Sequence, residues 1–152
     1  MAGRGEAVAR EDNYCEIDPN TVDKYGIPVL RFHYKWSDYE IKQARHMKET
    51  FKEIIANAGG VVTWGDNDTE ENQYGLEAPG RIIHEVGTTR MGNDPRKSVV
   101  NKFNQAHECK NLFIVDGGPF VSQADKNPTW TILALSMRAS EHLIDEMKKQ
   151  NL

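Results

Sequence analysis

The sequence predicts an α/β domain, because strand-like and helix-like patterns follow one another along the chain. Residues 29–36 alternate in polarity, with a period of two that is typical of a strand with one buried face. An amphipathic helix is predicted directly after this strand, and a second long helix near the end of the chain. Between the helices, a short apolar run at residues 112–115 that stops at glycines predicts a buried strand.

Residues 1–28 are predicted to be irregular, because turn-forming residues cluster there. In the strand that follows, His33 lies on the more polar face, where we expect a solvated or hydrogen-bonded side chain. The opposite face, which we expect to be buried, carries Leu30, Phe32, Tyr34 and Trp36.

A capping-box pattern marks the start of the first helix. Ser37 is the expected N-cap, and Glu40 is expected to bond back to it. Apolar residues then recur at steps of three and four until Gly59 and Gly60, which are expected to end the helix. These apolar positions are Ile41, Ala44, Met47, Phe51, Ile54, Ile55 and Ala58.

Residues 61–64 and 81–84 are expected to form short strands on either side of a polar surface loop. The final helix is expected to begin with Asn127 as N-cap and Pro128 in the first turn, where a missing N–H costs little. One apolar stripe of this helix is expected to pack in the core, and it comprises Ile132, Leu135, Ala139, Leu143 and Met147.

Composition excludes several classes of protein. The 152 residues make one domain or part of a larger one, and a formal net charge of -4 argues against a nucleic-acid partner. No apolar run is long enough to span a membrane, and the N-terminal residues lack the apolar region of a signal peptide. Cys15 and Cys109 are too few for a disulfide framework, and no metal site is predicted. These observations do not assign a cellular compartment.

Three stretches hold more Gly, His, Asn and Thr than packing alone requires: residues 84–95, 115–120 and 127–132. Glycines let the backbone approach a ligand closely, and a helix start offers N–H groups to an anion or an electron-rich ring. His84 is an acid–base candidate near neutral pH. Each pattern taken singly also has a structural interpretation, since His84 suits packing and Asn127 suits a helix cap.

Together and in this order, the stretches resemble the C-terminal part of the glucose–methanol–choline (GMC) oxidoreductases, flavoenzymes that use FAD. The resemblance is strongest over residues 81–147 and extends to residues 14–58. It implies an α/β fold with part of a mixed sheet of the substrate region, plus the last strand and long C-terminal helix of the FAD-binding domain. The implied organisation is an irregular segment at 1–28, a strand–helix segment of the substrate region with a surface loop at 29–80, and flavin-facing motifs at 81–152.

The resemblance also assigns roles to single residues. His84 matches the histidine of the pattern His-x-x-Gly-Thr-x-x-Met-Gly, which implies that it faces the flavin and exchanges a proton with the substrate hydroxyl. Asn127 precedes a Pro-Thr-x-Thr pattern and is expected to hold the substrate oxygen by a hydrogen bond. The implied FAD contacts are Asp116, Gly117, Asn127, Pro128 and Thr129.

The chain departs from the family pattern in two respects. Gly118 follows the Asp116-Gly117 pair where the family often has serine, which is a mild change in a loop. The Gly-x-Gly-x-x-Gly loop that holds the ADP half of FAD has no counterpart in the sequence. We therefore expect the C-terminal portion of an FAD-dependent oxidoreductase acting on the CH–OH group of an alcohol or sugar. Its N-terminal FAD-binding half is expected in cis or in trans.

Two other interpretations stay open. One is a non-catalytic fragment or subunit that needs a separate FAD-binding chain, which the missing fingerprint favours. The other is a plain α/β binding module for an acidic or nucleotide-like ligand at the helix start near Asn127. That module would explain the loop and the helix, but not why the stretch around His84 occurs with them.

Overall fold

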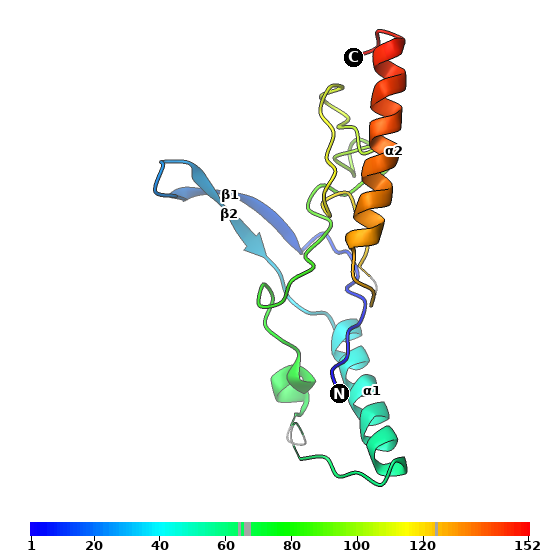
Figure 1. Cartoon of the computed structure of the whole chain (residues 1–152). Helices are drawn as coiled ribbons and strands as arrows, with labels where there is room; N and C mark the ends of the chain where they lie inside the picture. The colour runs from blue at the N-terminus through cyan, green and yellow to red at the C-terminus, as the bar shows by residue number, and fades with distance from the viewer. Residues whose placement is uncertain (64, 66–67, 124) are drawn as a thin grey trace. The chain divides into compact units, whose positions relative to one another are not determined.

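The computed structural model describes residues 1–63, 65, 68–123 and 125–152, which divide into two units, Met1–Ile83 and His84–Leu152 (Figure 1). The elements of the first unit are strand β1 (Tyr14–Val22), strand β2 (Pro28–His33), helix α1 (Asp38–Asn57) and the 3-10 helix η1 (Glu70–Gly75). The second unit contains helix α2 (Thr129–Lys148), and its other described residues form turns, bends and isolated bridges.

β1 and β2 form a two-stranded antiparallel hairpin whose turn is built around Asp23. The Asp23 carboxylate accepts hydrogen bonds from the amides of Tyr25 and Ile27, at 2.8 and 3.0 Å. Gly26 adopts a φ of 81°, which residues with a side chain rarely reach. The turn is therefore specified by one acidic side chain and one glycine.

β1 lies inside the segment at residues 1–28, so the prediction that this segment is irregular is wrong for Tyr14–Val22. Pro19 obscures the strand in the sequence, because proline has no N–H to donate to a ladder. The strand accommodates it with a register shift between Ile17 and Val22. The buried Asp18 lies in this interval and accepts hydrogen bonds from Arg31 of β2 at 2.7 and 3.1 Å.

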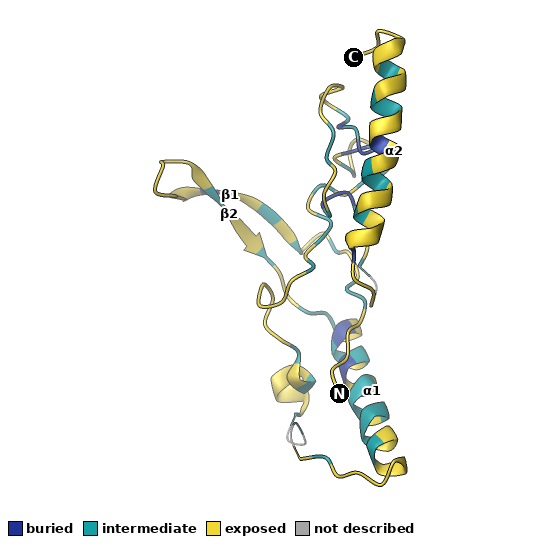
Figure 2. Cartoon of the chain, viewed as in Figure 1, coloured by how far each residue is buried: buried dark blue, intermediate teal, exposed yellow. Residues whose placement is uncertain are grey.

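β2 confirms the strand predicted within residues 29–36, and His33 at its end is hydrogen-bonded as expected. The His33 Nε2 atom lies 2.9 Å from Glu16 Oε1, and the ring stacks on Tyr14 with centroids 4.4 Å apart. The buried face predicted for this strand is wrong, since Leu30 and Phe32 are 55% and 63% exposed (Figure 2). A two-stranded hairpin has no second layer of its own to cover a face.

The predicted capping box is confirmed at the start of α1. Ser37 is the N-cap, its side chain accepts a hydrogen bond from the Tyr39 amide, and Glu40 bonds back to the Ser37 amide at 2.7 Å. The helix ends where the glycines were expected, with Gly59 at a φ of 75°. The Gly60 amide donates to the Ile55 carbonyl at 2.9 Å, which satisfies one of the free carbonyls of the last turn.

The short strands predicted around the polar loop are not formed by the described residues. Residues 61–63 have no strand pairing, and Trp64 lies outside the described residues. Residues 81–83 form bends, and His84 has a φ of 87°, which is incompatible with a β-strand. The loop between them contains η1, where Gln73 and Tyr74 also adopt positive φ.

The core of the second unit lies between α2 and residues 100–119. Val100, Asn104 and Pro119 are fully buried, and Ala139 of α2 is nearly so. The apolar run at residues 112–115 forms a single bridge, between Phe113 and Gln105, instead of a regular strand.

Side chains of α2 tie the helix to the segments beside it. The His142 ring stacks on Phe103 with centroids 3.9 Å apart. The Ser136 hydroxyl donates to the Val115 carbonyl at 2.8 Å. Residues 112–115 are therefore anchored on the helix by the Val115 carbonyl and by the Phe113 ring, which meets the His142 ring edge-on with centroids 6.3 Å apart, although they form no ladder.

α2 confirms the long C-terminal helix, but Asn127 is not its N-cap. The N-cap is Pro128, whose carbonyl accepts the first hydrogen bond of the helix from the Ile132 amide at 2.9 Å. Because a proline has no side-chain acceptor, the first turn of α2 has no side-chain cap. The expected core stripe is only partly buried, since Ala139 is buried while Met147 is largely exposed.

Candidate functional site

Residues 84–92 and 116–120 run side by side and are joined through their backbones. The amides of Gly87, Thr89 and Met91 donate to the carbonyls of residues 117, 118 and 119, at 3.2, 3.1 and 3.0 Å. These bonds connect the first two of the three motif stretches, residues 84–95 and 115–120. Gly118 also donates its amide to the Asp116 carboxylate at 2.7 Å, so Asp116 closes the turn in which it lies.

His84 begins the first stretch with an unusual backbone. Its φ of 87° is rare for a residue with a side chain, and such strain is concentrated at functional sites. Its side chain is half-buried. With this φ, His84 cannot belong to the strand that was expected at residues 81–84. The chain continues from it into the segment that ends at Gly92.

The three stretches meet at a pocket of about 300 Å³ within the second unit. Met91 comes from the first stretch, Phe120 from the second, and Asn127 and Thr131 from the third. Phe120, Met91 and the α2 residue Leu135 make an apolar part of the lining, while Asn127 and Thr131 add polar groups. The remaining lining residues are Pro119, Val121, Ser122, Gln123, Lys126 and Pro128.

The start of α2 contributes to this pocket through the residues around Pro128. Helix α2 has no acidic residue in its first turn and no side-chain cap, so its partial positive charge is not neutralised locally. An ion pair lies next to it in the chain, between Lys126 and Asp125. The hydrogen bond from Lys126 holds the pKa of Asp125 below its usual range.

The structure brings together some of the predicted site residues and not others. Asn127 and Pro128 line the pocket, whereas His84, Asp116, Gly117 and Thr129 do not belong to its lining. Gly117 is still close to α2, since a β-carbon there would lie 3.7 Å from Ile132. Four lining residues come from loops without a motif and were not predicted: Val121, Ser122, Gln123 and Lys126.

Other candidate chemistry finds no support in the described residues. Within residues 1–63, 65, 68–123 and 125–152, no group of three or more His, Cys, Asp or Glu side chains could hold a metal ion. Both cysteines are free, and the Cys109 thiol donates to Asn111 Oδ1 at 3.1 Å. In the same part of the chain, no helix has the length and apolar character needed to cross a membrane.

Comparison with known proteins assigns the family. A model of the GMC oxidoreductases matches residues 9–136, which covers all three motif stretches. The 2-methyl-1,2-propanediol dehydrogenase of Mycolicibacterium austroafricanum is 35% identical over 139 residues, which make up 91% of this chain and 24% of that enzyme.

Two further relatives match a similar share of this chain and of their own length. The C-glycoside 3-oxidase of Arthrobacter globiformis is 32% identical over 91% of this chain and 25% of its own length. The fructose dehydrogenase large subunit of Gluconobacter japonicus is 29% identical over 95% of this chain and 25% of its length. The chain thus spans about a quarter of each relative. It belongs to the GMC oxidoreductases and corresponds to a C-terminal part of them.

Proposed function

We propose that the chain is the catalytic C-terminal portion of an FAD-dependent oxidoreductase that acts on a CH–OH group of an alcohol or a sugar. The observation that carries the proposal is the meeting of the three motif stretches at one pocket, through Met91, Phe120 and Asn127. In the complete protein, residues 112–115 and α2 would then form the end of the FAD-binding domain, and residues 29–80 a part of the substrate region with its mixed sheet.

The pocket residues fit a flavin ring. A flat heterocycle has apolar faces and polar edges, and the lining offers apolar side chains beside the Asn127 amide and the Thr131 hydroxyl. The uncapped start of α2 favours a ring that gains electron density. When bound, FAD supplies the redox chemistry by accepting a hydride from the alcohol carbon. Pro128 and Thr129 would contact the ring, and Asp116 and Gly117 the ribityl and pyrophosphate part.

His84 would act as the base in this reaction. The hydroxyl proton must leave as the carbon loses its hydride, and an imidazole can accept that proton near neutral pH. Asn127 cannot take a proton, but its amide can donate a hydrogen bond to the substrate oxygen and hold it in place. The strained backbone of His84 supports a functional role, since strain of this kind must be stabilised by the surrounding structure.

The names of the relatives support an alcohol or sugar as substrate. One relative is named for a diol, 2-methyl-1,2-propanediol, and another for fructose. Both dehydrogenases and oxidases occur among them, so the electron acceptor is not part of the proposal. The second candidate is a non-catalytic subunit that needs a separate FAD-binding chain, because the sequence contains no Gly-x-Gly-x-x-Gly loop.

The visible absorption spectrum tests the proposal. FAD is added to the purified chain, alone and together with an FAD-binding half, and the protein is desalted. We expect the assembled protein to retain a flavin band that an alcohol or sugar bleaches without oxygen. His84→Ala should keep the band but slow bleaching about 100-fold or more. Equal bleaching rates would remove His84 from the mechanism, and a flavin that no substrate bleaches would favour the non-catalytic subunit.

A further inference from the structure

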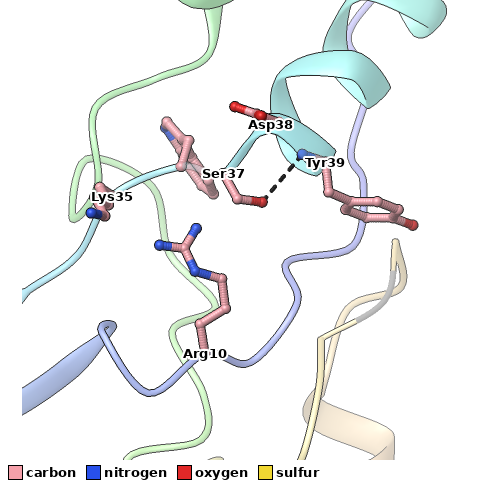
Figure 3. A pocket seen from close by; sticks show the side chains of 6 residues that line it. Arg10, Lys35, Ser37, Asp38 and Tyr39 are labelled. Atoms are coloured by element: carbon pink, nitrogen blue, oxygen red, sulfur yellow. Dashed lines mark hydrogen bonds between the residues drawn. The ribbon is translucent and has the colours of Figure 1, made fainter.

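We propose that the first unit binds a neutral polyol or monosaccharide in a second pocket, formed where the chain after β2 enters α1 (Figure 3). It is a shallow hollow of about 480 Å³ that is widely open to solvent. The inference is independent of the proposed function, because no residue is shared with the pocket at α2. The lining residues are Arg10, Lys35, Trp36, Ser37, Asp38 and Tyr39.

Two aromatic side chains in this pocket can pack against a sugar. Trp36 is held in place, because its Nε1 donates to the Glu77 carbonyl at 3.0 Å and its ring meets Tyr34 edge-on with centroids 5.2 Å apart. Tyr39 is 48% exposed, so its side chain is open to a ligand. A preordered ring gives apolar contact to the C–H groups of a sugar and loses little side-chain entropy on binding.

Most of the charged groups around the pocket are already paired with neighbouring groups. Asp12 accepts a hydrogen bond from Arg10 Nε at 2.8 Å and lies 3.3 Å from Lys35 Nζ. The hydrogen bond from Arg10 lowers the pKa of Asp12 to about 2, so this carboxylate stays ionised at neutral pH. Asp12 lies outside the lining, and Asp38 places a carboxylate at the lining itself. The Glu40 carboxylate, which accepts a hydrogen bond from the Ser37 amide, adds a third anion near Arg10, and it too already has its own partners.

This pairing favours a neutral polar ligand over other classes. An anion would have to displace Asp12 from Arg10 and Lys35, and an apolar ligand would remove charged groups from water without giving them partners. A sugar presents C–H groups to the rings and hydroxyls to the charged donors and acceptors. The helix dipole is not the basis of the site, since the capping box of Ser37 and Glu40 already satisfies the start of α1.

Indole N–H signals in a nitrogen-15 NMR spectrum of the whole chain test the inference. The chain has three tryptophans, and Trp→Phe changes at Trp36 and Trp130 assign two of the three signals, one for each unit. We expect D-glucose to shift the Trp36 signal and to saturate by about 100 mM, where a millimolar site is filled. The Trp130 signal should not follow this saturation curve.

Matched variants locate the ligand. Tyr39→Ala should weaken glucose binding about tenfold, whereas Tyr25→Ala, which removes an exposed tyrosine of the hairpin turn, should leave it unchanged. The inference is overturned by a Trp36 signal that does not saturate, by equal affinity in both variants, or by saturation with gluconate and not with glucose. Saturation confined to Trp130 would also overturn it, while leaving the proposed function intact.

Discussion

The Thr89 hydroxyl lies so close to Gly118 that a β-carbon on Gly118 would stand 2.2 Å from its oxygen. The same β-carbon would lie 2.9 Å from Asp116 Oδ1. A side chain at position 118 would therefore require Thr89 or Asp116 to move. The contact also explains how residues 84–92 approach residues 116–120 closely enough to form three backbone hydrogen bonds.

Gly118→Ala should therefore destabilise the second unit. The added methyl must move Thr89 or separate the two segments, and overpacking of this kind costs about 2 kcal/mol. The free energy of unfolding of the chain, measured by denaturant titration, reports the loss.

A double-mutant cycle identifies the neighbour responsible. The buried Thr89 hydroxyl has no hydrogen-bond partner in the described part of the chain, so Thr89→Ala removes no hydrogen bond that the structure shows. In the Thr89→Ala background, Gly118→Ala should cost clearly less than in the unchanged chain. Strict additivity of the two free energies would show that Thr89 is not the group that excludes a side chain at Gly118.

The positive φ of His84 predicts that two variants at this position differ in their free energy of unfolding. Both His84→Gly and His84→Ala lose the side chain, but only glycine adopts a φ of 87° without strain. His84→Gly should therefore be more stable than His84→Ala by about 1 kcal/mol. Ala56→Gly in α1 is the control, because there glycine should be the less stable residue by about 1 kcal/mol. A less stable glycine variant at His84 would contradict the strain.

How far the sequence predicts the fold depends on how local the determinants are. α1 is predicted to within a residue at each end, since Ser37, Glu40 and Gly59 determine its ends through neighbouring backbone groups. The start of α2 is displaced by one residue, because Asn127 is a good cap by type but Pro128 provides the first helical carbonyl. β1 is missed because Pro19 interrupts its pattern, and its register is set by pairing with a distant segment.

The site is predicted less completely than the helices. The motif stretches gave Asn127 and Pro128, which line the pocket, because both lie at a recognisable helix start. Gln123 and Lys126 could not be found in this way, since they come from a loop whose path depends on tertiary contacts. The backbone conformation of His84 could not be predicted either. An apolar run before a histidine predicts a strand, whereas the φ of 87° at His84 excludes one.

Glu40 predicts a loss of stability in acid. Its carboxylate accepts hydrogen bonds from the amides of Val8 and Ser37, at 2.9 and 2.7 Å. Burial raises the pKa of Glu40, but these bonds and the bond from the Ser37 side chain outweigh it, so the pKa lies below the usual value of 4.5. A lowered pKa means that the stabilisation is complete above about pH 4.5 and is lost as the pH falls through the lower pKa of the folded chain.

Glu40→Ala should destabilise the first unit by about 2 kcal/mol at neutral pH, because two backbone amides lose their acceptor. The difference from the unchanged chain should shrink below about pH 4.5. Thermal unfolding followed across pH measures both effects. Glu53→Ala, on an exposed face of the same helix, should change little at either pH. A Glu40→Ala difference that is constant down to pH 3 would show that the charged form is not the one stabilised.

Asn127→Asp tests the placement of the pocket beside the flavin in the assembled protein. The new carboxylate would lie at the pocket that Pro128 and Thr131 also line, next to a ring that becomes electron-rich on reduction. A negative charge there stabilises the oxidised ring relative to the reduced one, so reduction by substrate should slow about tenfold or more. Anaerobic stopped-flow absorbance measures this rate. Asn57→Asp, at the end of α1, adds the same charge outside the pocket and should leave the rate unchanged. Equal or faster reduction in Asn127→Asp would place the flavin elsewhere, because a carboxylate in contact with the ring cannot be neutral toward its reduction.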